Sequence, residues 1–134
     1  MNIIAPSILR FSIRALGIGT ILFGVAPIVA PRRFAHTFGL PAEGTASHVA
    51  IRSVGVRDMV IGAGLLESAS RPEENARWLL ARAASDAGDA ISCLVALLND
   101  RRNTRLWLLA GVAGGAAVVD AALALLTAPL DSKR

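Results

Sequence analysis

The stretch ARWLLARAASDAGDAISCLVALLN, residues Ala76–Asn99, sets the interpretation of the whole chain. It predicts a largely apolar helix with the length of a membrane span, yet it carries Arg82, Asp86 and Asp89, which make it too charged to be assigned to a membrane by hydropathy alone. Positions i, i+4 and i+7 lie on one face of an α-helix, so these ionisable side chains share a single stripe. Charged side chains on such a helix are costly unless they face a protein interior. The stretch therefore predicts a helix with a polar inner face, and a functional site would lie on that face.

Three more apolar segments of similar length accompany this stretch, and short polar turns separate all four. Because about 20 apolar residues match the thickness of a bilayer, we expect an all-α fold, a four-transmembrane-helix bundle that fills residues 1–134 as one domain. Residues 34–45 contain Gly39, Pro41 and Gly44 and are expected to form a loop or a short interfacial turn. The expected helices cover about residues 8–29, 46–68, 76–99 and 106–128.

Composition also favours a membrane protein. Hydrophobic residues make up 54% of the chain and charged residues 18%, with a mean hydropathy of +0.55, whereas a soluble domain is about 45–50% apolar and about 25% charged. The net charge of +4 comes from arginine, which commonly faces lipid headgroups at helix ends. The arginines do not cluster around aromatic residues, so no nucleic-acid partner is expected. We expect the lipid bilayer as the partner and a multi-pass position in a membrane, the bacterial inner membrane.

Two alternatives to this interpretation concern the fold and the first segment. A soluble four-helix bundle would show a polar stripe on every helix, but the segment over residues 106–128 has Asp120 as its single charged residue. A signal peptide would also begin with basic residues followed by an apolar run. Against it, the run is long, and Pro31 would directly follow the most plausible cleavage site, at Ala30.

Beyond their terminal turns, the four segments hold equal numbers of arginine and aspartate residues. An ionised side chain at the centre of a bilayer costs about 2.5–3.5 kcal/mol, so the matching numbers predict ion pairs. Arg82 and Asp86 can pair within one helix, whereas Asp89 needs a partner from another helix, such as Arg57. We expect one buried polar pocket around six of these residues. The pocket is expected to contain Arg57, Asp58, Arg82, Asp86, Asp89 and Asp120. The two remaining charged residues of the segments, Arg14 and Arg52, are expected to lie outside it.

Two carboxyl groups in unlike surroundings can act as acid and base. Asp86, Asp89 and Asp58 are therefore the candidate catalytic residues. The candidate substrate-binding residues are Arg57, Arg82, Asp120 and Arg52.

Two classes of function fit such a pocket. One is acid–base conversion (isomerisation, cyclisation or epoxide opening) or binding of a lipophilic small molecule. The other is a non-catalytic membrane subunit or a proton-linked carrier, in which the charges are structural ion pairs. The sequence leaves open whether the protein is an enzyme.

Metal and cofactor sites have little support in the sequence. Asp86-x-x-Asp89 with Asp120 offers oxygen ligands of the kind that Mg²⁺ prefers. The spacing is similar to that of the CDP-alcohol phosphotransferases, but the glycine and the Ala-Arg pair expected after the second aspartate are missing. Cys93 is the single cysteine, which excludes an internal disulfide and a multi-cysteine metal site. We therefore expect no metal and no cofactor.

The last apolar segment has a face of small residues. Gly111-x-x-x-Gly115 and the neighbouring alanines allow another helix to approach closely. This face permits a homo-oligomer but does not require one.

A family resemblance rests on the second segment. Residues 51–58, IRSVGVRD, followed by Ile61-Gly62, resemble the R-x-x-G-x-R-D…G signature of small four-helix membrane proteins of bacteria and fungi. These proteins are grouped as domain of unknown function 4267, and the segment with Asp86 and Asp89 fits the same pattern. The resemblance covers nearly the whole chain. It implies a four-helix integral membrane protein and no particular reaction.

Overall fold

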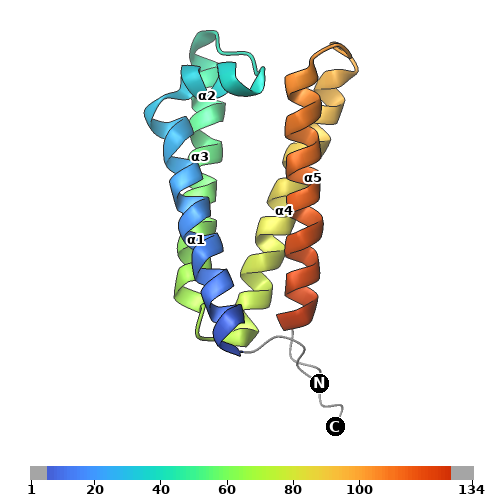
Figure 1. The fold of residues 1–134 in the computed structure, drawn as a ribbon. Helices are drawn as coiled ribbons and strands as arrows, with labels where there is room; N and C mark the ends of the chain where they lie inside the picture. Colours follow the sequence, from blue (N-terminus) through green and yellow to red (C-terminus); the bar gives the residue numbers. More distant parts are fainter. Residues whose placement is uncertain (1–5, 128–134) are drawn as a thin grey trace.

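The computed structural model describes residues 6–127, and this part of the chain is built from helices alone, which confirms the all-α expectation (Figure 1). Four of the helices are long and one is short. They are α1 (Pro6–Val29), α2 (Pro31–Phe38), α3 (Gly44–Ser68), α4 (Pro72–Leu97) and α5 (Thr104–Thr127). The long helices match the four expected segments. The expected end of the last one, at Ala128, lies outside the described residues.

The short helix α2 corrects the expected loop over residues 34–45. Pro31 stands in its first turn, where the missing N–H would have no helical partner and the fixed φ suits a helix start. Gly39 ends α2 in the left-handed conformation, at φ 69°, and its N–H reaches back to the carbonyl groups of Ala35 and His36. The irregular connection to α3 is therefore confined to residues 39–43. Pro72 likewise starts α4 earlier than the expected residue 76.

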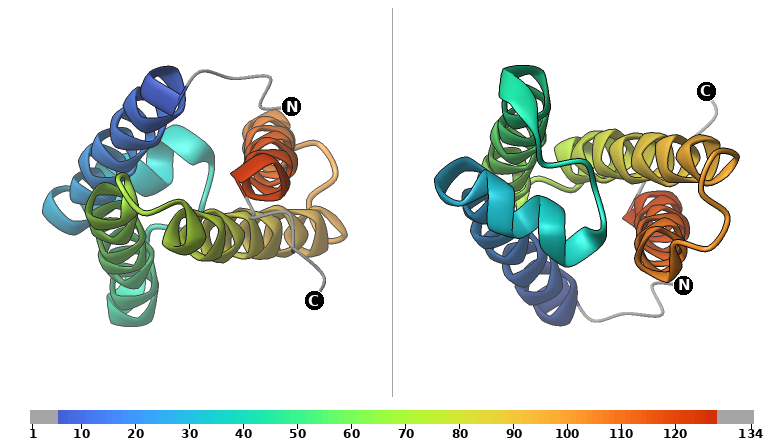
Figure 2. Two further views of the ribbon diagram at one scale, coloured as in Figure 1. Left: turned by 90° about the horizontal axis from the view of Figure 1, so that it is seen from below. Right: turned by 90° about the horizontal axis from the view of Figure 1, so that it is seen from above.

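The long helices form two pairs. Helix α1 packs along α3, and α4 packs along α5, whereas the two pairs meet mainly along α3 and α4. Figure 1 shows that the pairs converge near the α3–α4 turn and spread apart towards α2, and Figure 2 shows α1 and α5 apart from each other across the resulting gap. Helices α1 and α5 therefore do not pack along each other.

Glycines hold the first pair together. Gly17 and Gly24 of α1 face Gly62 and Gly55 of α3, with a spacing of seven residues on each helix. A Cβ atom on Gly24 would lie 2.6 Å from the carbonyl oxygen of Gly55, and one on Gly17 would lie 2.9 Å from that of Gly62. Real Cβ atoms do not approach so closely, so the two backbones touch only because side chains are absent here.

An apolar core closes the converging end, and hydrogen bonds tie the spreading end. At the spreading end, Asn103 Nδ2 donates to the carbonyl oxygen of Gly39 at 3.2 Å, and Arg105 Nη1 donates to that of His36 at 2.7 Å. These bonds join the C-terminal part of α2 to the start of α5. The core of the converging end draws on all four long helices: Ile13, Ile61, Leu65, Ala69, Leu79 and Ala124 are buried there.

Two of the long helices meet the length and hydropathy of a membrane span, namely Ser7–Val29 and Thr104–Thr127. By this test α3 and α4 do not, since each carries several charges. Gly111 and Gly115 of α5 have nothing within 4 Å of an added Cβ, so the close contact that these glycines allow is not made with any residue that the structure describes. A homo-oligomer that uses the face stays a prediction.

Candidate functional site

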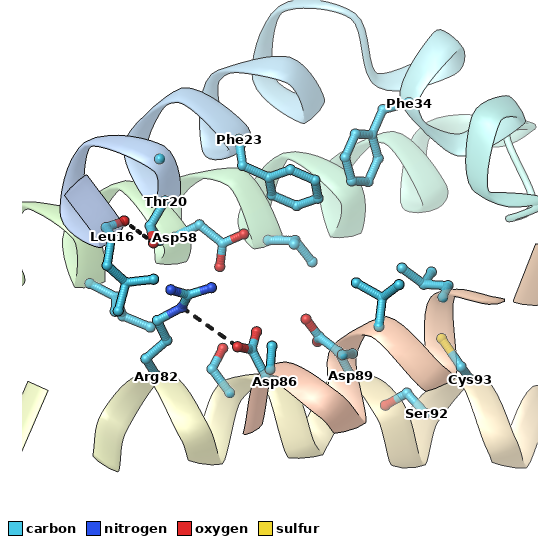
Figure 3. A pocket seen from close by; sticks show the side chains of 18 of the residues that line it. Leu16, Thr20, Phe23, Phe34, Asp58, Arg82, Asp86, Asp89, Ser92 and Cys93 are labelled. Atoms are coloured by element: carbon cyan, nitrogen blue, oxygen red, sulfur yellow. Dashed lines mark hydrogen bonds and ion pairs between the residues drawn. The ribbon is translucent and has the colours of Figure 1, made fainter. Parts of the chain in front are cut away.

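A cavity of about 610 Å³ lies between the two helix pairs, and Figure 3 shows it from close by. Most of its wall is apolar, and Phe23 and Phe34 stand together in one part of it, with ring centroids 5.5 Å apart. The polar side chains gather in another part, where α3 faces α4. The charged and hydroxyl-bearing lining residues are Thr20, Asp58, Arg82, Ser85, Asp86, Asp89 and Ser92.

Arg57 joins the two helix pairs at this site. Its Nη1 and Nη2 donate to the two oxygens of Asp89 on α4, at 2.9 and 2.7 Å, and its Nε and Nη2 donate to Asp58 Oδ1, at 3.1 and 2.9 Å. Arg57 and Asp58 are adjacent, so they leave the helix in different directions. The long arginine side chain bends back to reach its neighbour. The predicted partner of Asp89 from another helix is thus Arg57.

Arg82 forms a second, looser cluster with Asp86 and Asp120. Its Nε lies 3.5 Å from Asp86 Oδ2 on the same helix and 3.3 Å from Asp120 Oδ2 on α5. The Asp120 side chain is only 3% exposed, and those of Arg82 and Asp86 are 18% exposed. The predicted Arg82–Asp86 pair is present, and Asp120 extends it to the neighbouring helix.

Each of the two clusters has one arginine between two aspartates from different helices, but the clusters differ in their hydrogen bonds. The Arg57 cluster has well-formed bonds. In the Arg82 cluster, Arg82 Nη1, Asp86 Oδ2 and Asp120 Oδ2 are buried and have no hydrogen-bond partner among the described residues, and the same holds for Ser85 Oγ beside them. Buried polar groups are normally hydrogen-bonded, because a missing bond costs about 1–3 kcal/mol. The Arg82 cluster therefore has unused capacity to bind a polar group.

The structure separates the predicted site residues by position. Asp58, Arg82, Asp86 and Asp89 line the cavity, whereas Arg57 and Asp120 stand behind them and hold them. Arg52 is not brought to the cavity. It is exposed near the start of α3, and its Nε donates to the carbonyl oxygen of Ile28 at 3.3 Å.

Sequence reasoning missed several lining residues. Ser85 and Ser92 flank the aspartates and are seven residues apart, so they lie on the same face of α4 as the charged residues. The helical periodicity of the sequence could therefore have identified them. Phe23 and Phe34 come from different helices, and α2 was not expected, so the sequence held no signal for their meeting. Cys93 is free and buried, packed at the α4–α5 contact as well as against the cavity.

The alternative of a magnesium site gains no support. Among the residues whose side chains the structure describes, no group of three or more histidine, cysteine, aspartate or glutamate residues is arranged to hold a metal ion. Asp86 and Asp89 are instead held by two different arginines.

Comparison with known proteins places the chain in a family. The family described as Domain of unknown function (DUF4267) matches residues 17–127, from the first glycine contact of α1 to the end of α5. The chain belongs to the DUF4267 family. The matched region contains both arginine clusters and the whole cavity lining except Ala15 and Leu16. No curated protein and no solved structure matches the chain.

In this chain, each residue of the R-x-x-G-x-R-D…G pattern makes a contact. Gly55 and Gly62 let α3 touch α1, and Arg57 and Asp58 form the tie to α4. Arg52 bonds the end of α1. In this chain, the pattern thus combines close helix packing with the ion pairs at the wall of the cavity.

Proposed function

We propose that this DUF4267 protein is an integral membrane protein whose four long helices all lie in the bilayer. The support comes from the outer surface of the bundle. Large apolar side chains are exposed on all four helices, including Val56 and Val60 of α3 and Ile91 and Val95 of α4, each 54–61% exposed. Exposed apolar area of this extent marks contact with lipid or with another protein.

The position of the charges supports the same proposal. Every exposed arginine on the long helices lies within about two turns of a helix end, where headgroups would meet it. The ionisable residues in the middle of α3, α4 and α5 are half-buried or buried instead. They are Arg57, Asp58, Arg82, Asp86, Asp89 and Asp120.

Washing of isolated membranes with alkaline carbonate tests this position. We expect the protein to stay in the pellet with an integral marker protein, while a peripheral marker of the same membranes is released. Release of the protein with the peripheral marker would mean that the charged stripe is an ordinary solvated helix face, and the proposed location would be wrong.

We further propose that the cavity binds a lipophilic small molecule and that Asp86 exchanges a proton with it. The observation that carries this proposal is the unsatisfied Arg82 cluster at the wall of an otherwise apolar cavity. Ligand sites are commonly of this size and kind, mostly apolar with a few convergent polar groups. Two carboxyl groups that share one guanidinium keep one negative charge beyond what it neutralises, and a proton on either group removes that charge.

Each residue has a role in this proposal. Asp86 gives a proton to the ligand or takes one from it, and Arg82 orients Asp86 and offers Nη1 to an oxygen atom. Asp58 and Asp89, on the opposite side of the polar region, both accept hydrogen bonds from Arg57 and are the candidate bases. With an acid and a base on two sides of a ligand, isomerisation, cyclisation and epoxide opening are the reactions this geometry suits.

The alternative, in which the charges only join helices, is favoured for the Arg57 cluster. Its bonds are complete, and they connect α3 to α4 and hence the two helix pairs. We therefore assign Arg57 a structural part and Arg82 a functional one.

Mass spectrometry of the purified protein tests the proposal. The chain is extracted from its membranes in mild detergent, and the small molecules that co-purify are compared between the natural chain and Asp86→Asn. We expect a lipophilic compound that the natural chain retains and the variant loses, with the same elution volume for both proteins. If both retain the same compounds in the same amounts, Asp86 has no part in binding.

A further inference from the structure

The charges that line the cavity do not balance. Three carboxyl groups, those of Asp58, Asp86 and Asp89, face the cavity, against the single guanidinium of Arg82. With Arg57 and Asp120 behind them, the region holds two guanidinium and four carboxyl groups, a formal charge of −2 when all are ionised. In an apolar cavity such an excess is costly, so protons or a cation would be needed to compensate it.

The excess negative charge is least well compensated at Asp86. Asp58 and Asp89 both accept short bonds from Arg57. Asp86 and Asp120 share Arg82 at 3.5 and 3.3 Å without a well-formed hydrogen bond to it, and two ionised carboxyl groups in this position repel each other. A positive group beside Asp86 would relieve this repulsion, whereas an anion would add to it.

The remainder of the cavity suits an apolar, aromatic molecule. Phe23 and Phe34 stand edge to face on its wall, and Phe38 packs on Phe34 with ring centroids 4.8 Å apart. Aromatic faces attract organic cations as well as other rings. The volume of about 610 Å³ is within the usual range for a drug-sized molecule.

The cavity opens between α1 and α5. Ala15 and Gly19 of α1 and Val112 of α5 belong to its wall, and all three are exposed, Val112 at 69%. Figure 2 shows these two helices on the side where the helix pairs do not meet. On the proposed location, this opening faces the hydrocarbon of the bilayer, so a ligand would arrive through the lipid.

We propose that the cavity binds a lipophilic organic cation, which enters from the bilayer between α1 and α5 and places its charge beside Asp86. The inference rests on the proposed function and names its ligand class. The same excess of carboxyl groups disfavours amphiphilic acids and phosphates as ligands.

Binding of a matched pair of ions tests the charge. The full chain is reconstituted in nanodiscs of neutral lipid, and equilibrium binding of tetraphenylphosphonium is compared with that of tetraphenylborate, which has the same shape and the opposite charge. We expect saturable binding of the cation, weakened at least about tenfold by Asp86→Asn. Asp100→Asn, the same change in the exposed α4–α5 turn, should leave binding unchanged.

The outcomes separate the two proposals. Asp86-dependent binding of tetraphenylborate, or of the uncharged triphenylmethanol, in preference to the cation would overturn the ligand class and leave a lipophilic binding site in place. The absence of saturable binding for all three probes would overturn the ligand class, and if no compound co-purifies either, the binding function fails too. An elution volume of Asp86→Asn equal to that of the natural chain shows that the variant is folded.

A second pair of variants tests the route. Val112→Trp narrows the opening, and we expect it to slow association of tetraphenylphosphonium about tenfold. Val118→Trp is the matched control, because Val118 is on the same helix and 70% exposed but does not line the cavity. Equal association rates for the two variants would show that the ligand does not pass between α1 and α5.

Discussion

The contact between Gly62 and Gly17 gives a quantitative prediction for the stability of the α1–α3 pair. In Gly62→Ala, the new Cβ would lie 2.7 Å from the carbonyl oxygen of Gly17 and 2.7 Å from Ile21 Cγ1. Ordinary contacts begin at 3.4 Å, so the backbones must separate by about 0.7 Å. A carbonyl group of a helix cannot move aside as a flexible side chain can. Overpacking of this kind costs about 1–3 kcal/mol.

Gly115→Ala is the matched control, since an added Cβ there meets nothing within 4 Å. Both changes give the helix the same gain in propensity, up to about 1 kcal/mol, so the difference between the two variants isolates the packing cost. The assay is unfolding of the purified protein in mixed micelles with increasing sodium dodecyl sulfate, followed by circular dichroism. We expect Gly62→Ala to be about 1–3 kcal/mol less stable than Gly115→Ala. Equal stability of the two variants would refute the close contact of α1 and α3.

Three further predictions concern the polar contacts. Arg57→Gln leaves two aspartates without their cation, and we expect a loss of about 2–3 kcal/mol in the same unfolding assay; an unchanged midpoint would show that the tie between the helix pairs is dispensable. Asp120→Asn keeps the shape of a side chain that is 3% exposed but removes its charge. We expect weaker tetraphenylphosphonium binding by a chain that stays folded. Stronger binding would contradict the inference that excess negative charge attracts the cation. Arg105→Gln removes the hydrogen bond to the carbonyl oxygen of His36. We expect about 0.5–1.5 kcal/mol of destabilisation and faster proteolysis of residues 39–43. An unchanged cleavage rate would mean that other contacts hold α2 in place.

The periodicity of the sequence predicted the polar wall of α4, because the positions of Arg82, Asp86 and Asp89 on one face follow from helix geometry alone. It also indicated that Asp89 needs a partner from another helix, and the structure supplies Arg57. The spacing within a single helix does not tell which neighbour a face meets. For this reason the sequence placed Arg57 and Asp120 in the pocket itself, whereas both stand behind its wall.

The parts that could not be predicted depend on how helices are arranged relative to one another. Gly111 and Gly115 have the spacing of a helix contact, but their side of α5 faces outward. The aromatic wall of the cavity needs α2, which begins at Pro31 and occupies part of the expected loop over residues 34–45. The opening between α1 and α5 follows from the splay of the pairs, which no local pattern encodes.

The way each arginine is shared has a consequence for biosynthesis. Arg57 is neutralised by Asp58 beside it and Arg82 by Asp86 one turn away, so α3 and α4 each carry a partner for their own cation when they leave the ribosome. Asp89 and Asp120 belong in each case to the next long helix along the chain and join the arginine afterwards. On the proposed membrane location, α4 thus completes the charge cluster of α3, and α5 completes that of α4, in the order in which these helices are translated.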